Sequence, residues 1–172
     1  MDKQWNIICE LTDKNVLGTD GFSQKEPRKK SRAILINAEG KYAIIYEKQS
    51  GFHTFPGGGI ENGENEETAI IREVLEETGC SCDIVNPLGI VYENRFHSDS
   101  AHLTYYFVIH TKTQDPVPQY TNEEMELKTM IKWCSLDEAI HLIRDARYNS
   151  NHKRFLKARD LAALNQYIDT IK

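Results

Sequence analysis

The stretch that most constrains this chain is residues 58–80, GGIENGENEETAIIREVLEETGC, which predicts a glycine-rich approach followed by a helix. At about 100° per residue, Glu73, Glu76 and Glu77 fall within roughly 100° of arc on one helical face. Like charges three and four residues apart destabilise a helix, and acids near its C-terminus oppose the macrodipole. A sequence that gathers these unfavourable terms in one place predicts compensation from outside the helix. A divalent cation is the simplest candidate.

The alternative for these glutamates is an ordinary acidic face exposed to water. Arg72, four residues before Glu76, is the only cation within helical reach of them in the sequence. Mutual repulsion, the position at the helix end and the glycine-rich approach all favour the functional interpretation. We expect the opposite, core-facing side of the helix to be formed by Ile71, Val74, Leu75 and Thr78.

Composition is that of one ordinary globular domain. The chain has 172 residues, of which 40% are hydrophobic and 27% charged, and this length is sufficient to enclose a hydrophobic core. We therefore expect a single domain over residues 1–172. It would have a polar N-terminal segment at residues 1–30 and a C-terminal helix at residues 150–172 that packs on it.

Charge and hydropathy limit the partners that we expect. A net charge of −5 argues against stable, nonspecific binding to nucleic acid but leaves a nucleotide substrate open. No stretch approaches the ~20 apolar residues of a membrane span. The first residues lack the basic and apolar regions of a signal peptide, which predicts a cytoplasmic location. The oligomeric state is left open as monomer or homodimer.

Local patterns predict a mixed α/β order of elements. Ala38-Glu39-Gly40 separates two short apolar runs and predicts a hairpin turn. Pro56 and the three glycines after it predict a loop outside regular structure. Glu66 and Glu67 suit the N-terminal end of the following helix, and Gly79 suits its stop. The expected strands are residues 5–10, 33–37, 41–47, 83–95, 102–111 and 130–134, and helices are expected after Ser135 and over 154–171.

Two further features have competing interpretations. Residues 25–32 carry five cations and are either a solvated connector or a basic flank for substrate phosphates. The four cysteines (Cys9, Cys80, Cys82 and Cys134) form no CxxC pair. We expect them to be reduced and mostly buried rather than redox-active or nucleophilic.

The chemistry of the acidic helix favours hard cations. Mg²⁺ and Mn²⁺ prefer oxygen ligands, which three convergent glutamates supply. Gly57 and Gly58 have no side chain that would keep backbone carbonyls away from the same ion. Such a cluster suits phosphoryl chemistry, in which the metal neutralises phosphate oxygens and a carboxylate takes a proton from water.

The spacing of these residues resembles the Nudix box, the signature of the Nudix hydrolase family. The matching positions are Gly58, Glu64, Arg72-Glu73-Val74, Glu76-Glu77 and Gly79-Cys80. The resemblance implies an α/β/α sandwich with a mixed β-sheet. It also implies hydrolysis of a nucleoside diphosphate linked to another moiety, with Mg²⁺ or Mn²⁺ as the cofactor.

Carried over by position, the resemblance implies roles for individual residues. Glu73, Glu76 and Glu77 would bind the metal together with the Gly57 carbonyl. Arg72 would hold the carboxylates in register through Glu64 and Glu73. The alternative for all of them is a purely structural, salt-bridged turn.

A general base from outside the box is also expected in this family. Glu123 and Glu124 are the candidates, and we assign Glu124 to the catalytic set. The alternative for both residues is ordinary surface.

The substrate is less constrained than the chemistry. We assign Arg32, Phe55, Gly58 and Gly59 as candidate substrate contacts. Phe52, Phe55, Tyr92, Phe96 and Tyr106 either stack on a base or fill the core, and the core is favoured for each. His53, His97 and His102 border the expected site, with polar surface as the alternative. Nucleoside triphosphates, including oxidised ones, are favoured over capped or triphosphorylated RNA ends.

Two classes of function follow. The first is an active, metal-dependent pyrophosphohydrolase. The alternative is a Nudix-like module that senses a nucleotide and regulates a partner without hydrolysis. The undamaged box favours the enzyme.

Overall fold

A mixed β-sheet forms the centre of the structure, a computed structural model that describes residues 5–112, 118–122, 125 and 129–172. The strands within these residues are β1 (Ile7–Thr12), β2 (Arg28–Ile36), β3 (Tyr42–Glu47), β4 (Phe52–Thr54), β5 (Gly57–Gly59), β6 (Cys82–Arg95), β7 (Ser100–Thr111) and β8 (Thr129–Cys134). Their order is β1-β6-β7-β2-β3-β4, with β5 added to β2 and β8 added to β3. The β1–β6 and β2–β7 pairs are parallel and the others antiparallel, so the predicted mixed sheet is confirmed.

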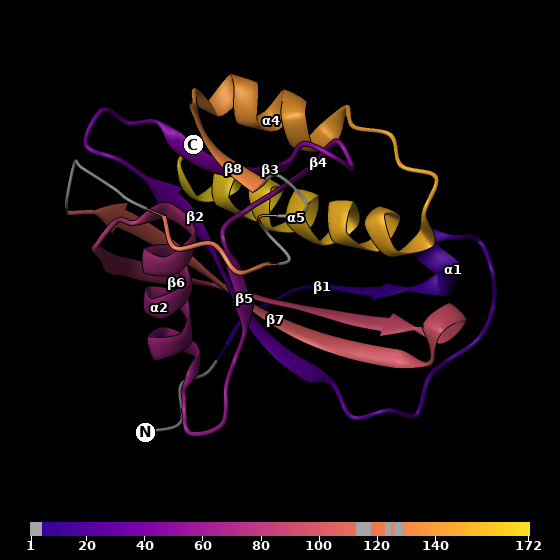
Figure 1. Cartoon of the computed structure of the whole chain (residues 1–172). Coiled ribbons are helices and arrows are strands. Elements are labelled where there is room, and N and C mark those ends of the chain that lie inside the picture. The colour runs from indigo at the N-terminus through magenta and orange to yellow at the C-terminus, as the bar shows by residue number, and fades with distance from the viewer. Residues whose placement is uncertain (1–4, 113–117, 123–124, 126–128) are drawn as a thin grey trace.

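Helices lie on both faces of this sheet (Figure 1). The helical elements are α1 (Asp13–Val16), α2 (Glu66–Thr78), the 3-10 turn η1 (Phe96–Ser98), α4 (Leu136–Arg144) and α5 (Asn151–Thr170). Helix α2 contacts β2, β5 and β6, whereas α5 contacts β1, β4 and β6, and α4 packs on α5 and β3. The α/β/α sandwich is therefore confirmed. None of the helices in the described part of the chain combines the length and the hydropathy that a membrane span requires.

Strand β2 is buried on both faces, which explains its unbroken apolar run. Ala33 and Leu35 point into a core with α2, and Ile34 and Ile36 point into the core beneath α4 and α5. Strand β7 runs parallel to β2 and divides its side chains between the same two cores. The two cores fix the sheet between its helices.

Short-range signals in the sequence were sufficient for the turns and helix ends. The predicted hairpin turn closes with a 2.9 Å hydrogen bond from Gly40 N to Asn37 O, at a Gly40 φ of 73°. Helix α2 begins after Asn65, whose side chain accepts from the backbone N–H of Thr68 at 2.8 Å. It ends at Gly79, which has a left-handed φ of 71°. These predictions are confirmed.

The glycine run is not the loop that the sequence predicts. Residues Gly57–Gly59 form β5, and Gly57 pairs with Arg32 of β2 while Gly59 pairs with Lys30. Gly57 has a φ of 137°, and a Cβ there would overlap the Ser31 carbonyl oxygen and Arg32 Cα. Because glycine has no side chain, Gly57 can approach β2 at a position where any other residue would clash. The prediction of a loop was wrong because this pairing depends on a partner far away in sequence.

The core-facing side of α2 is also shifted from the predicted one. Ile71 and Leu75 are 43% and 51% exposed. The buried positions are Ala69, Ile70, Val74, Glu77 and Thr78. The helix is turned so that the i, i+4, i+7 stripe formed by residues 70, 74 and 77 faces the sheet. One of the three glutamates, Glu77, consequently lies on the buried side.

The basic segment at residues 25–32 belongs partly to the sheet. Residues 28–32 form the first half of β2, and Ser31 is fully buried, whereas Lys30 and Arg32 are partly buried. A solvated connector is therefore the wrong interpretation for this half of the segment.

Both ends of the described chain pack on the sheet. The early strand is confirmed as β1, which runs parallel to β6. Helix α5 begins after Ser150 and buries Phe155, Leu164 and Tyr167, although Ile171 is exposed beyond its end. The single domain over residues 1–172 stays a prediction.

The β2–β5 pairing predicts different effects for two neighbouring glycines. Gly57→Ala should lower the free energy of unfolding by about 3 kcal/mol or more, because it adds a clash to an unfavourable positive φ. Gly59→Ala is the matched control, because nothing lies within 4 Å of the Cβ that it would add. It should change the free energy by less than about 1 kcal/mol. Urea denaturation of both variants measures the difference, and equal stabilities would contradict the pairing.

Candidate active site

Helix α2 carries the acidic residues because its two ends are held by local signals. The Asn65 side chain accepts from backbone N–H groups in the first turn, and the left-handed Gly79 lets the chain leave after Thr78. Ser31 Oγ of β2 also donates to the Glu66 carbonyl at 2.8 Å. The first turn of α2 is thereby fixed against the strand that pairs with the glycines.

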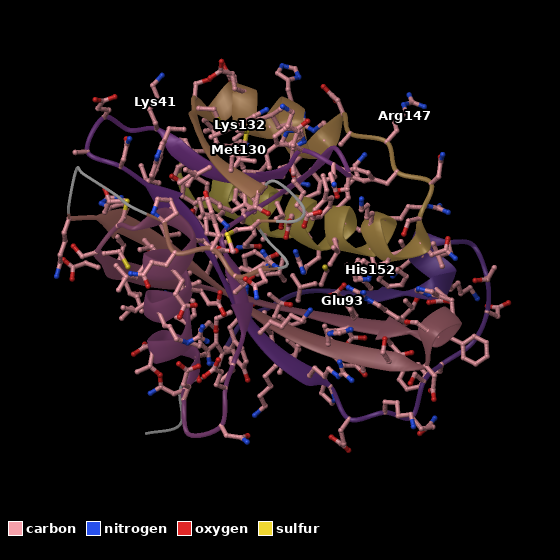
Figure 2. The ribbon with its side chains drawn as sticks, viewed as in Figure 1. Lys41, Glu93, Met130, Lys132, Arg147 and His152 are labelled. Atoms are coloured by element: carbon pink, nitrogen blue, oxygen red, sulfur yellow. The ribbon has the colours of Figure 1, made fainter. Side chains whose placement is uncertain are left out.

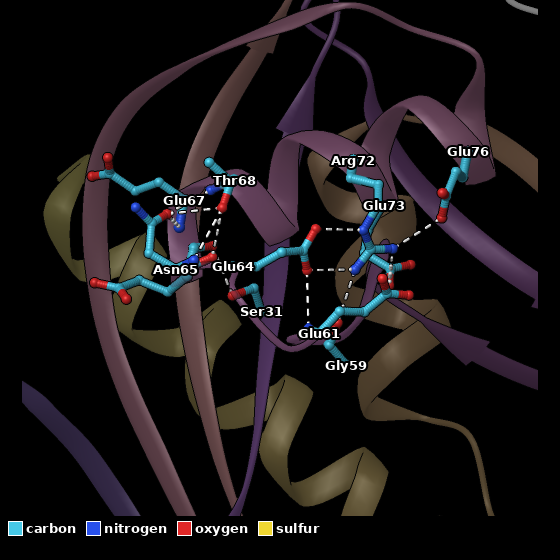
Figure 3. A network of polar contacts seen from close by, with 11 residues as sticks. Ser31, Gly59, Glu61, Glu64, Asn65, Glu67, Thr68, Arg72, Glu73 and Glu76 are labelled. Carbon is cyan, nitrogen blue, oxygen red and sulfur yellow. Dashed lines mark hydrogen bonds and ion pairs between the residues drawn. The ribbon is translucent and has the colours of Figure 1, made fainter.

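Arg72 is the centre of a network that joins three carboxylates (Figure 3). Its Nε and Nη2 donate to the two carboxylate oxygens of Glu64 at 2.8 and 3.0 Å. Its Nη1 donates to Glu73 at 2.8 Å and to Glu76 at 3.0 Å. Nη2 also donates to the Gly59 carbonyl at 3.0 Å. The predicted contacts of Arg72 with Glu64 and Glu73 are therefore confirmed, and Glu76 joins them.

This network lowers the pKa of the Glu64 carboxyl. The hydrogen bonds from Arg72 lower the pKa of Glu64 to about 2, and the Glu61 backbone N–H acts in the same direction. The paired fork of a guanidinium and a carboxylate also sets the orientation of both groups. Glu64 thus positions Arg72, and Arg72 in turn positions the carboxylates of α2.

Glu73 is packed against the middle glycine of β5. A Cβ on Gly58 would overlap the Glu73 carboxylate in its present position, so the glycine lets that carboxylate lie against the strand. Burial raises the pKa of Glu73, although the hydrogen bond from Arg72 opposes this effect. A partly buried carboxylate beside further acids is a site where additional positive charge is favourable.

Glu77 occupies a different environment from the other two glutamates of the set. It is 8% exposed, and its Oε2 accepts from the Gly57 backbone N–H at 2.6 Å. Glu76, by contrast, has a side chain that is 43% exposed. The three carboxylates on this helix therefore differ in exposure, and the Glu73 side chain, at 15%, lies between the other two.

The donor set fits a hard divalent cation. In the described parts of the chain, no group of three or more His, Cys, Asp or Glu side chains is already arranged to hold a metal ion. Arg72 instead bridges Glu73 and Glu76. These oxygens and the glycine backbone are nevertheless the ligand type that Mg²⁺ and Mn²⁺ prefer. Metal binding would require a cation to compete with Arg72 for the two carboxylates.

The predicted substrate contacts have different positions. Arg32 Nη1 donates to the Phe55 carbonyl and, at 3.2 Å, to Thr54 Oγ1, and its Nε is buried without a partner. Phe55 is fully buried in the core, so its side chain offers no surface to a ligand. This burial favours the core interpretation, which also holds for Phe52 and Tyr106 but not for the exposed Phe96.

Two other predicted features can be placed only in part. Glu123 and Glu124 lie outside the described residues, so the general base stays a prediction. All four cysteines are free. Burial raises the pKa of Cys9 and of Cys82 to about 11, which disfavours a thiolate nucleophile.

Sequence reasoning missed a second group of polar residues, between the sheet and α5. We call it the buried polar cluster; its members are Glu93, Arg95, His102, Thr104, Arg159 and Asp160, each at most 8% exposed. Polar surface was one of the two interpretations of His102, and its burial contradicts that interpretation. Charged residues at alternate positions of a strand normally indicate a solvated face, and only the docking of α5 turns this face inward. The adjacent Arg159 and Asp160, in a helix whose apolar residues lie at helical spacing, were the available signal.

The fold and the glutamate-bearing helix define a class of α/β/α sandwich proteins. The family model of the NUDIX domain matches residues 27–158, and the chain belongs to this family of hydrolases. Enzymes of this family generally require divalent metal ions.

Individual relatives share modest identity with the chain. A protein of Bacillus subtilis (strain 168) with the provisional name 8-oxo-dGTP diphosphatase is 31% identical over 70 residues, 41% of this chain and 46% of that protein. The match thus spans less than half of that relative's length. Diphosphoinositol polyphosphate phosphohydrolase 3-alpha of Mus musculus is 23% identical over 139 residues, 79% of this chain and 78% of that protein. A Nudix hydrolase structure from Nitrosomonas europaea superposes with a TM-score of 0.60 at 22% identity, covering 84% and 90% of the two chains.

The Arg72 network predicts an unusual titration of Glu64. In metal-free protein, NMR titration of the Glu64 side chain should show it ionised down to about pH 2. In Arg72→Met the pKa should rise towards the ordinary glutamate value of about 4.3. Because the pKa of Glu64 is lowered on folding, its stabilising contribution is present above the ordinary pKa. It is lost as the pH falls towards 2. Circular dichroism checks that the variant folds; an unchanged titration in a folded variant would contradict the network.

Proposed function

We propose that the chain is a Mg²⁺- or Mn²⁺-dependent pyrophosphohydrolase that cleaves a nucleoside diphosphate linked to another moiety. The observation that carries the proposal is the contact between α2 and β5. Glu73 lies against Gly58, Glu77 accepts from Gly57 N–H, and Arg72 donates to the Gly59 carbonyl. This arrangement brings hard oxygen donors and a glycine backbone together at one end of the sheet.

In this proposal each residue has a separate task. Glu73, Glu76, Glu77 and the Gly57 carbonyl would hold the cation, which would supply charge neutralisation for the phosphate oxygens and a Lewis acid for water. Arg72 orients the carboxylates and is itself oriented by Glu64. The backbone of Gly58 and Gly59 leaves a substrate phosphate room to approach.

The base that takes a proton from the attacking water is assigned to Glu124, which stays a prediction. The box glutamates are the alternative source, because they lie on the same helix face as the proposed cation. Replacing each in turn and comparing pH profiles separates these possibilities.

The names of the relatives widen the substrate class. One names an oxidised nucleoside triphosphate and another a diphosphoinositol polyphosphate. Both compounds contain a phosphate anhydride on a polyanionic molecule. Nucleoside triphosphates, including oxidised ones, are the first substrates to test, and the wider class is phosphate anhydrides on polyanionic carriers.

Loss of single carboxylates tests the proposed metal set. Glu76→Gln and Glu77→Gln should each lower kcat by about 100-fold or more, because a neutral amide neither balances the charge of the cation nor holds it firmly. Glu67→Gln is the matched control, since it removes a carboxylate from the first turn of the same helix. Release of phosphate or pyrophosphate from a nucleotide panel measures the effect.

Two outcomes would contradict the enzyme assignment. Wild-type turnover in both glutamine variants would remove the glutamates from the mechanism. Tight, metal-dependent ligand binding in calorimetry without any product would favour the sensing module.

Removal of metal provides an independent test. Exhaustive treatment with EDTA should abolish turnover, and adding back Mg²⁺ or Mn²⁺ should restore it, because the carboxylates alone repel a phosphate. The same titration should fail to restore the Glu77→Gln variant at cation concentrations that saturate the wild type. Activity that persists in the chelated protein would contradict the proposed cofactor.

A further inference from the structure

The buried polar cluster contains polar atoms that the protein leaves without partners. Glu93 Oε2, His102 Nδ1, Thr104 Oγ1 and Arg159 Nη1 are all buried and lack a hydrogen-bond partner. Each belongs to a side chain that is more than nine-tenths buried. Buried polar groups in folded proteins are almost always paired. Four unpaired groups in one cluster indicate that something outside the chain completes it.

Strand register brings these atoms together on one face. Glu93 of β6 lies opposite His102 of β7, and Thr104 of β7 lies opposite Lys30 of β2. Helix α5 covers them: Arg159 Nε donates to Tyr106 Oη at 3.0 Å. Figure 2 shows Glu93 and His152 between α5 and the β6–β7 hairpin, and His152 Nδ1 lies 2.9 Å from Arg95 Nη1.

The charges in this region do not balance. Arg95 contacts Glu93 at 2.5 Å, and Arg159 contacts Asp160 at 2.8 Å. Lys30 and Arg32 of β2 add two cations with no further carboxylate among the cluster residues. The described cluster and these two neighbours therefore carry a formal excess of two positive charges.

The pKa values of two titratable groups reflect both burial and this excess of positive charge. Burial lowers the pKa of His102 to about 3, and Arg95, Lys30, Arg159 and Arg28 contribute to the shift. Burial also lowers the pKa of Lys30 to about 8, and Arg32 and Arg159 lower it further. Additional positive charge is thus disfavoured throughout the cluster, as expected for a site that receives an anion.

We propose that the buried polar cluster binds a second phosphate group of the substrate, carried on a sugar beside a free hydroxyl. This inference rests on the proposed hydrolysis of a phosphate anhydride and names the part of the substrate that is not cleaved. Arg159 Nη1, Thr104 Oγ1 and the Lys30 ammonium donate to phosphate oxygens. Glu93 Oε2 can only accept, so it takes the neighbouring hydroxyl of the sugar.

The position along β2 fits one molecule that reaches both sites. Arg32 pairs with Gly57, whose carbonyl belongs to the proposed metal set, and Lys30 lies two residues further along the strand. At about 3.3 Å per residue, the two backbone positions are about 7 Å apart along the strand. The charge of Arg32 also acts on Glu73 of the acidic helix, so the two faces are within electrostatic reach of each other at this point. A diphosphate and a phosphate on the attached ribose can span that distance. Lys30 and Arg32 are only partly buried and connect the cluster with the surface beside β5.

A matched pair of compounds tests the preference for the second phosphate. NADP⁺ and NAD⁺ share a diphosphate linkage and differ in one phosphate on the ribose, beside a free hydroxyl. We expect kcat/KM to be at least tenfold higher for NADP⁺, through a lower KM. Thr104→Val should remove most of this preference, because it deletes one donor to the phosphate.

The control for Thr104→Val is Thr129→Val on β8. Thr129 has the other buried threonine hydroxyl without a partner in the described residues, and β3 separates its strand from β2. It should leave the ratio between the two compounds unchanged. A purely structural hydroxyl at Thr104 would predict the same result for both variants.

A binding measurement separates this inference from the proposed function. In metal-free protein, adenosine 2′,5′-bisphosphate should raise the melting temperature more than 5′-AMP does. The difference should shrink in Thr104→Val and in Lys30→Met, which keeps an apolar stem of similar length. This readout does not require turnover, so it remains informative if the enzyme cleaves neither dinucleotide.

Specific outcomes would overturn the inference. If Glu77→Gln abolishes turnover of nucleotides but the bisphosphate and 5′-AMP stabilise the protein equally, the second-phosphate site is wrong and the catalytic proposal stands. A cluster filled by water alone predicts that equality. If the bisphosphate is preferred but no phosphate anhydride is cleaved, the proposed function is wrong and the cluster is an anion site.

Discussion

The close pairing of β5 with β2 is the constraint on which the candidate active site depends. Each of the three successive glycines meets a different residue of α2. Gly57 donates its N–H to Glu77, Gly58 leaves room for Glu73, and Gly59 accepts from Arg72. The backbone of one short strand therefore sets the positions of the helix side chains. A side chain at Gly57 would clash with the backbone of β2, and one at Gly58 would displace the Glu73 carboxylate.

Much of this arrangement follows from sequence-local rules. The caps at Asn65 and Gly79 define α2 within the chain itself, and the Asn37–Gly40 turn defines the first hairpin. Arg72 could be expected to reach Glu76 because residues one helical turn apart are neighbours. Such features need no knowledge of the rest of the fold, so spacing and residue type were sufficient to predict them.

The features that sequence reasoning missed all depend on long-range pairing. A run of glycines predicts a loop unless a distant strand accepts it, and Arg32 lies far from Gly57 in sequence. The burial of Glu77 depends on which face of α2 packs against the sheet. The amphipathic pattern of this helix is too weak for the sequence to determine that face. Glu93 and Arg95 alternate as a solvated strand face would, until α5 covers them. The two side chains compensate each other's charge through the Arg95–Glu93 ion pair.

Strand β2 links the two regions through the alternation of its side chains. Ser31 points to the α2 side and donates to the Glu66 carbonyl, whereas Lys30 and Arg32 lie on the face that α5 covers. Adjacent residues thus fix the acidic helix and supply cations to the buried polar cluster. The net charge of −5 hides this separation, since negative charge gathers beside β5 and positive charge gathers beneath α5. A ligand that binds through a cation beside β5 and directly to cations beneath α5 carries anionic groups at both places. One strand can therefore select a polyanion over a compound with a single diphosphate.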